Sequence, residues 1–184
     1  APRPLKTMSK LTPEQLDKGR MVAAAYEMDH QINKNMDKGF SMRTATDSAL
    51  IRHGDAILKQ TELAGYKVIE KLSDKQYLVL EKANEVKVVF RGRAGDNAVD
   101  NAHVSDAFRG RARDYGYIND LMGELQLARP DANVEVVSYS NGGPKGLHMA
   151  ETFGLPHHTI DPVLGPKEVA LLSKRGPKSA HLDL

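Results

Sequence analysis

Cysteine and tryptophan are absent from this chain of 184 residues, and aromatic residues make up only 5% of it. The lack of cysteine excludes disulfides, thiolate zinc sites and cysteine nucleophiles together. No run of about 18 apolar residues occurs, so no transmembrane helix is predicted. A formal net charge of +2 is too small to indicate a nucleic-acid-binding protein by itself. These absences argue against disulfide-rich, thiolate-metal and membrane-spanning classes.

The composition that remains is that of an ordinary globular protein, with 40% hydrophobic and 27% charged residues. A length of 184 residues is enough for one domain with its own core. We expect residues 1–10 to form a flexible basic arm, 11–65 a helical segment packed on the core, and 66–184 the core itself. The chain begins at Ala1 and has no signal-peptide pattern, which fits either a processed product or an excised fragment; we expect a soluble protein of unassigned compartment.

Residues 11–65 are expected to form a pair of helices. The T-P-E-Q sequence that starts at Thr12 has the residues of a helix N-terminus, with Gln15 in place to complete a capping box. A second helix is expected over 46–64. In the first helix, apolar residues at helical spacing predict a core-facing stripe before Gly39: Met21, Ala25, Met28, Ile32 and Met36.

From residue 66 onward the apolar pattern takes the period of β-structure. The first three strands are separated by short turns, which favour an antiparallel meander. The later strands alternate with helices, which predicts a parallel sheet with right-handed crossovers and helices on both faces. The strands are expected over 66–72, 76–82, 86–90, 134–139, 157–163 and 180–184. Of the helices between them, the first carries apolar residues from 118 to 125 and ends at 129–130, the second includes 147–153, and the third covers 167–172. The fold class is therefore α/β, with antiparallel entry strands and a parallel βαβ core.

The most informative stretch runs from 134 to 146, with the sequence V-E-V-V-S-Y-S-N-G-G-P-K-G. An apolar, β-branched run leads into a serine, a glycine pair and a helical pattern. This order is typical of a nucleophile elbow, a strained strand-to-helix turn that exposes a nucleophilic hydroxyl. Backbone crowding requires small residues two positions before and after the nucleophile, and Ser138 and Gly142 meet that requirement. The pattern predicts Ser140 as the nucleophile of a hydrolase.

A nucleophilic serine also needs donors for the oxyanion that forms on the acyl carbonyl. At an elbow, one donor is the N–H of the next residue, which is Asn141 here. The second comes from a loop after an earlier strand, where the sequence R-G-R-A begins at Arg91. Because Gly92 allows that backbone to approach closely, the Arg93 N–H is the candidate second donor.

These motifs resemble those of the class 3 lipases. V-V-F-R-G-R at 88–93 is similar to the family's F-R-G-T strand end, which supplies an oxyanion donor, and V-V-S-Y-S-N-G-G at 136–143 is similar to its G-H-S-L-G-G elbow. D-N-A-H-V-S-D at 100–106 and T-I-D-P-V-L-G at 159–165 resemble two further family segments, so the resemblance spans about residues 60–170 in order. It implies an α/β-hydrolase-like fold and a serine ester hydrolase of lipase or esterase type, with an ester or lipid substrate.

The chain departs from the family pattern around the nucleophile. Ser138 and Tyr139 replace the elbow's glycine and histidine, and Arg93 replaces a threonine while keeping the backbone N–H. By the family's layout, the acid and the histidine base lie near or beyond Leu184, the last residue of this chain. The resemblance therefore does not by itself provide a complete catalytic triad.

Two completions of the triad are open. Asp161 and His181 follow Ser140 in the order Ser, Asp, His that α/β-hydrolases use, so they are the candidate acid and base. Alternatively, a partner chain or another segment of a longer precursor supplies them, or activity has been lost. In the last case we expect a catalytically inactive hydrolase-fold protein with a structural or nucleic-acid-associated role.

Arginines are the basis of the nucleic-acid alternative. Two R-G-R-A segments precede a pair of tyrosines, and arginine with nearby aromatics can hold phosphates and stack on bases. Neighbouring aspartates favour instead a solvated, partly ion-paired loop. The arginines concerned are Arg91, Arg93, Arg109, Arg111 and Arg113. A third hypothesis makes S-N-G-G-P-K-G a phosphate site with Lys145 as counter-charge, but the glycine-rich phosphate motifs are absent.

The histidines do not indicate a metal site. His157 and His158 are adjacent in a predicted strand, so their side chains are expected on opposite faces. His30, His53 and His103 have no companions at metal-ligand spacing. We therefore expect capping or solvated roles for these histidines, and the sequence predicts neither a metal nor a cofactor.

Overall fold

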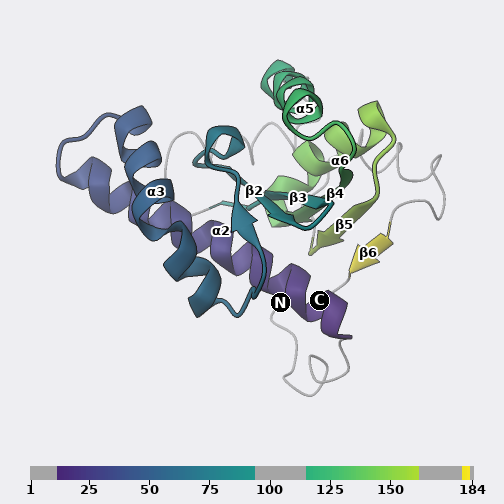
Figure 1. Ribbon diagram of the computed structural model, residues 1–184, viewed down its shortest axis with the longest axis horizontal. Helices are drawn as coiled ribbons and strands as arrows, with labels where there is room; N and C mark the ends of the chain where they lie inside the picture. Colours follow the sequence, from purple (N-terminus) through teal and green to yellow (C-terminus); the bar gives the residue numbers. More distant parts are fainter. Residues whose placement is uncertain (1–11, 94–114, 162–179, 183–184) are drawn as a thin grey trace.

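One mixed β-sheet runs through the part of the chain that the computed structural model describes, residues 12–93, 115–161 and 180–182 (Figure 1). Its strands are β1 (Lys67–Val68), β2 (Tyr77–Lys82), β3 (Glu85–Phe90), β4 (Asn133–Tyr139), β5 (His157–Ile160) and β6 (Ala180–Leu182). They follow one another in chain order across the sheet. The pairs β1–β2 and β2–β3 are antiparallel, and every later pair is parallel. The expected α/β class, with antiparallel entry and parallel core, is confirmed.

Two N-terminal helices, α2 (Pro13–Asp37) and α3 (Met42–Gln60), cover one face of this sheet (Figure 1). The expected capping box is present: the Thr12 side chain accepts from the Gln15 N–H, and the Gln15 side chain accepts from the Thr12 N–H. The apolar stripe of α2 packs against the strands as expected: Met21, Ala25, Met28 and Ile32 are buried, and Met36 is partly buried. Both the helical pair and its packing are confirmed.

Two further helices, α5 (Gly116–Ala128) and α6 (Gly143–Phe153), pack on the opposite face. Successive side chains of β3 face opposite sides of the sheet and so contribute to both cores. Val88 and Phe90 lie in the core under α5 and α6, whereas Val89 lies in the core under α2 and α3. Helices therefore cover both faces, as the sequence predicts. Within the described residues, no helix has the length and apolar character needed to cross a membrane.

Several expected boundaries are wrong. The helix α3 ends at Gln60 rather than at 64, and β5 ends at Ile160 rather than at 163, because Asp161 leaves the strand with a φ of 41°. The helix α3 begins four residues earlier than expected, because Ser41 caps its N-terminus by accepting a backbone hydrogen bond. The segment 66–72, expected as one strand, forms only the short β1 and then a 3-10 turn, η1 (Glu70–Leu72). This turn buries Ile69 and Leu72 in one core, although residues three apart in a strand face opposite ways.

The parallel register brings the ends of β3 and β4 to the same edge of the sheet. Phe90 lies opposite Ser138, so the chain leaves both strands side by side. Ligand sites of α/β proteins gather at this carboxyl edge of parallel strands. The expected arm over 1–10 and the expected helix over 167–172 lie outside the described residues.

Candidate active site

Ser140 occupies a sharp turn between a strand and a helix. β4 ends at Tyr139, the 3-10 turn η2 (Ser140–Gly142) follows, and α6 begins at Gly143. The backbone of Ser140 has a φ of 49°, in the left-handed region that residues other than glycine rarely adopt. Such a conformation costs on the order of 1–3 kcal/mol and persists only where the surrounding structure enforces it. The strained strand–turn–helix arrangement expected around Ser140 is present.

Glycines allow this turn because the neighbouring atoms leave no space for a side chain. A Cβ on Gly142 would lie 2.5 Å from the Phe90 carbonyl oxygen and 2.7 Å from that of Arg91. A Cβ on Gly146 would lie 2.9 Å from the Cβ of Ser138. Larger residues at either position would push α6 away from the sheet, so these glycines set how closely the helix follows the turn.

The loop after β3 meets the turn at Gly92. A Cβ on Gly92 would lie 3.0 Å from Ser140 Cβ, 3.0 Å from the Tyr139 carbonyl oxygen and 2.8 Å from Tyr26 Oη. The close backbone approach expected at Gly92 is therefore confirmed. It places the peptide groups on either side of Gly92 directly beside Ser140.

An open pocket of about 540 Å³ lies beside Ser140, within the range of about 300–1,000 Å³ that small-molecule sites occupy. One wall comes from α2, and the other from the elbow and the loop after β3. Tyr26 on α2 meets Tyr139 edge to face, with ring centroids 6.0 Å apart. The lining residues are Gly19, Val22, Ala23, Tyr26, Arg93, Tyr139 and Ser140. The sequence did not predict that α2 forms a wall of this pocket, because the apolar stripe of α2 indicates only that the helix packs against the core.

Arg91 is buried, with only 2% of its surface exposed. Its guanidinium donates to the Lys75 carbonyl at 2.9 Å, to the Gly92 carbonyl at 2.6 Å and to the Asp29 carboxylate at 3.2 Å. The Lys75 ammonium forms a second ion pair with buried Asp29, at 2.5 Å. The expectation that Arg91 contacts a nucleic acid is therefore wrong, because its charged group points into the protein.

The other basic residues of the nucleic-acid and phosphate hypotheses differ in where the structure places them. Arg93 is exposed and lines the pocket beside Ser140. Lys145, the suggested counter-charge for a phosphate, is buried and donates to Gln76 Oε1 at 3.1 Å. Three other residues lie outside the described part of the chain: Arg109, Arg111 and Arg113.

A buried serine–histidine pair lies on the α6 side of the sheet, and sequence reasoning missed it. Ser138 Oγ is 2.7 Å from His157 Nε2, and both residues are fully enclosed. Parallel pairing of β4 with β5 puts Val136 opposite His157, and the two-residue period turns Ser138 to the same face. The only sequence signal was a serine where the family pattern has glycine. This hydroxyl is separate from that of Ser140, which lies beyond the end of the strand.

The candidate acid and base are not joined to Ser140 by any contact of the described residues. Asp161 is exposed and follows the end of β5, with a positive φ of 41°. The backbone of His181 lies in β6, where it pairs with Thr159, and its side chain is outside the described part. Of the described histidines, none is hydrogen-bonded to Ser140; His148 contacts Asn119 Oδ1 at 3.1 Å. The triad of Ser140, Asp161 and His181 stays a prediction.

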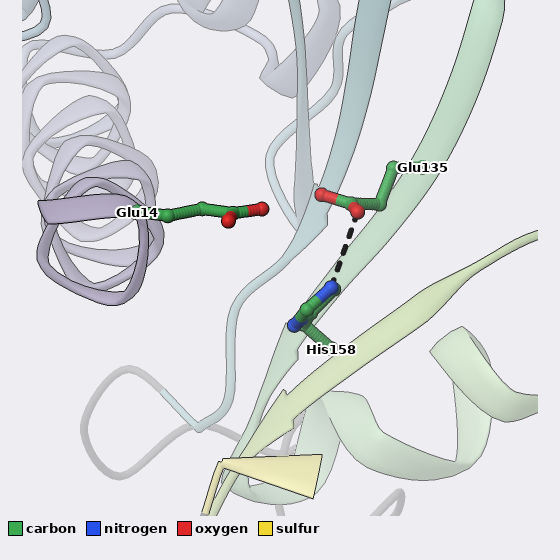
Figure 2. Close-up of side chains that lie close together, drawn as sticks. All are labelled: Glu14, Glu135 and His158. Atoms are coloured by element: carbon green, nitrogen blue, oxygen red, sulfur yellow. Dashed lines mark ion pairs between the residues drawn. The ribbon is translucent and has the colours of Figure 1, made fainter. Parts of the chain in front are cut away.

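A cluster of charged residues joins the start of α2 to the sheet (Figure 2). His158 Nε2 on β5 lies 3.2 Å from Glu135 Oε2 on β4, and Glu14 on α2 points toward the pair. Their ligand atoms all lie within 4.8 Å of one another, a spacing that a metal ion accepts. However, Lys18 Nζ lies 2.8 Å from Glu14 Oε1 and 3.2 Å from His158 Nε2. The Lys18 ammonium thus already supplies positive charge to this cluster.

The histidine of the cluster does not have the surroundings of a metal ligand. A metal-bound histidine almost always donates its second ring N–H to an acceptor. His158 Nδ1 is buried and has no partner within the described residues. His157 and His158 do face opposite sides of the sheet, as expected, because one contacts Ser138 and the other Glu135.

Glu135 has the most perturbed carboxyl group of this cluster. Burial alone would raise its pKa, but hydrogen bonds from His158 and Lys87 outweigh burial and lower the pKa of Glu135 to about 2. Lys87 Nζ lies 3.0 Å from Glu135 Oε1. Burial alone would lower the pKa of Lys87, yet the hydrogen bond with Glu135 leaves it raised. The ion pair that attaches α2 to β4 is that of Lys18 Nζ with Glu135 Oε1, at 3.5 Å, and β4 is the strand that leads into the turn at Ser140.

Among the described residues, an open pocket therefore lies at Ser140, and two polar clusters, one around Arg91 and Asp29 and one around Lys18 and Glu135, hold α2 beside it. No family model matches the chain, and neither the curated proteins nor the solved structures searched contain a match.

Proposed function

We propose that this protein is a serine ester hydrolase of lipase or esterase type with an α/β-hydrolase-like fold, in which Ser140 is the nucleophile. The observation that carries the proposal is the left-handed backbone of Ser140 at a strand-to-helix turn, beside an open pocket. Backbone strain at a residue with a nucleophilic hydroxyl is a feature of active sites. The resemblance of both motifs to the class 3 lipases agrees with this assignment.

In the proposed reaction, Ser140 Oγ bonds to the acyl carbon while its proton passes to a histidine base. The carbonyl oxygen becomes an oxyanion, which the N–H groups of Asn141 and Arg93 stabilise. The alcohol leaves with the proton held by the base. Water then attacks the acyl-enzyme by the same route and regenerates the serine. Asp161 and His181 are the candidate acid and base, with a partner chain or a precursor segment as the alternative source.

The pocket favours an ester with an apolar acyl group. Its walls combine the aliphatic side chains of Val22 and Ala23 with the rings of Tyr26 and Tyr139. Small-molecule pockets are mostly apolar with a few polar groups at the reacting end, and here Ser140 is that polar end. If the acyl chain of the substrate lies against the α2 wall of the pocket, its carbonyl group lies beside Ser140.

A fluorophosphonate probe tests the proposal, because it bonds covalently only to an activated serine. We expect the wild-type protein to be labelled and Ser140→Ala to be unlabelled. Ser138→Ala is the matched control, since it removes a hydroxyl two residues away that is buried against His157. Labelling of that variant should persist. Circular dichroism of each variant establishes that it is folded.

Folded wild-type protein that neither reacts with the probe nor hydrolyses p-nitrophenyl esters would overturn the proposal for this chain. The non-catalytic alternative, a hydrolase-fold protein with a structural or nucleic-acid-associated role, would then stand. Labelling that persists in Ser140→Ala would assign the reaction to another residue.

A further inference from the structure

We infer that Arg91 is a positioning residue that directs the Arg93 N–H toward the oxyanion, and that α2 holds the loop in which both residues lie. The inference rests on the proposed function, because it concerns a group that acts beside Ser140. Arg91 itself is buried and does not line the pocket. Its effect on catalysis therefore passes through the peptide that it holds.

The peptide between Gly92 and Arg93 is held at its carbonyl end. The Gly92 carbonyl oxygen accepts a hydrogen bond from Arg91 Nη1 at 2.6 Å. In a trans peptide the carbonyl and the following N–H point in opposite directions. The Arg93 N–H therefore points away from the buried guanidinium. Gly92 packs on Ser140 and Arg93 lines the pocket with it, so this direction leads to the side where the oxyanion forms.

The guanidinium cannot release that carbonyl easily, because its other nitrogens are also bonded. Nε donates to the Lys75 carbonyl at 2.9 Å, and Nη2 donates to Asp29 Oδ1 at 3.2 Å. A planar guanidinium holds several acceptors at fixed angles, whereas a lysine ammonium is a single point charge on a flexible stem. The pairing with Asp29 also keeps the buried charge compensated. Asp29 therefore fixes Arg91, and Arg91 fixes the peptide.

The helix α2 holds the next peptide of the loop as well. Tyr26 and Asp29 are three residues apart on α2, so they lie on the same helix face. Tyr26 Oη donates to the Arg93 carbonyl at 3.3 Å. The peptides on both sides of Arg93 are thus tied to one helix, directly through Tyr26 and indirectly through Asp29 and Arg91. A loop held in this way presents its N–H before substrate arrives, which is what oxyanion stabilisation requires.

The test compares kcat and KM for p-nitrophenyl butyrate between wild type, Arg91→Lys and Tyr26→Phe. Loss of an oxyanion donor lowers kcat by about 10²–10³-fold, so a misdirected donor in Arg91→Lys should lower kcat by about 10–100-fold. KM should stay within about twofold, because the oxyanion exists only in the transition state. Tyr26→Phe should give a smaller decrease of the same kind.

Two controls separate positioning from loss of stability. Arg129→Lys is matched in chemistry, since Arg129 also bonds a carboxylate, of Glu81, and a backbone carbonyl, but at the C-terminal end of α5 beside β2. Leu50→Val loosens the core under α3 without touching the loop. Both should keep the wild-type kcat, and Leu50→Val should lower the melting temperature.

The inference fails if folded Arg91→Lys keeps the wild-type kcat, or if its kcat falls only in proportion to its folded fraction. If Arg91→Lys does not fold, Tyr26→Phe decides, because it removes one hydroxyl at the pocket: an unchanged kcat overturns the inference and a lower kcat at constant KM supports it. A wild-type protein without Ser140-dependent activity overturns the proposed function and this inference together. An active wild type with fully active variants overturns this inference alone.

Discussion

Gly92 packs so closely on Ser140 that no side chain fits between them, since a Cβ on Gly92 would lie 3.0 Å from Ser140 Cβ. The contact joins the loop after β3 to the turn after β4. Neither loop determines the other's position; the parallel pairing of β3 with β4, with Phe90 opposite Ser138, brings them together. Stability and activity should therefore both depend on this contact.

Gly92→Ala should destabilise the protein, because the added methyl group meets backbone as well as side-chain atoms. We expect the free energy of unfolding to fall by about 1–3 kcal/mol, as for overpacking elsewhere. Urea denaturation measures this change. Gly123→Ala in α5 is the control, since its Cβ would meet no atom within 4 Å, and helix propensity should stabilise it by about 0.5–1 kcal/mol. Equal effects of the two substitutions would contradict the close packing at Gly92.

Ser140→Gly should be more stable than Ser140→Ala, although both lack the nucleophile. The φ of 49° strains alanine as much as serine, whereas glycine adopts this conformation freely. We expect the free energy of unfolding of the glycine variant to exceed that of the alanine variant by about 1 kcal/mol. Thermal and urea denaturation of the two variants check it, and the same stability for both would mean that the backbone at Ser140 is relaxed.

Ser138→Ala should cost about 1–3 kcal/mol of stability, because it removes the 2.7 Å hydrogen bond between the buried Ser138 hydroxyl and His157 Nε2. Thr159→Val is the matched control on the neighbouring strand. Thr159 Oγ1 is buried without a partner among the described residues, so its removal should be neutral or stabilising. Urea denaturation should separate the two variants. A loss of stability in Thr159→Val as large as in Ser138→Ala would contradict the assigned hydrogen bonding.

Acid should destabilise the protein through Glu135. Its pKa is lowered from 4.5 to about 2 in the folded state, so its contribution is fully present above pH 4.5 and is lost as the pH falls toward 2. We expect that contribution to be on the order of 1–3 kcal/mol. Unfolding measured across this pH range should show a shallower pH dependence in Glu135→Gln.

Glu81→Gln is the control for the acid prediction. The hydrogen bond from Arg129 also lowers the pKa of Glu81, but that pair is exposed to solvent. Screening makes exposed pairs weak, so this variant should keep most of the wild-type pH dependence. If Glu81→Gln flattens the pH profile more than Glu135→Gln, the buried cluster is not the source of the effect.

Much of the architecture could be predicted from local sequence signals. The capping box at Thr12, the apolar stripe of α2 and the run into S-Y-S-N-G-G each determine nearby structure, because capping, periodicity and small residues act over a few positions. The boundary errors have the same origin. The apolar residues of the segment 66–72 fit a strand. The segment forms a turn because Ile69 and Leu72 are both buried in the same core, which the sequence alone does not indicate.

The partners of the candidate site could not be predicted in this way. From the basic segment around it, Arg91 was expected at the surface. In the structure it is buried and forms an ion pair with Asp29, which lies 62 positions earlier in the chain. The pair of Ser138 with His157 depends on the pairing of β4 with β5. Such contacts follow from strand order and register, which no local pattern contains.

The sequence by itself determined that a strand enters a strained turn at Ser140 and that glycines surround it, because side-chain size and backbone freedom are local properties. The tertiary structure decided what meets that turn: the Gly92 loop, the wall supplied by α2, and the buried Arg91 that holds the loop. The physical reason is that these contacts join segments far apart in the chain, and the sheet order together with the packing of α2 on the sheet sets which of them become neighbours.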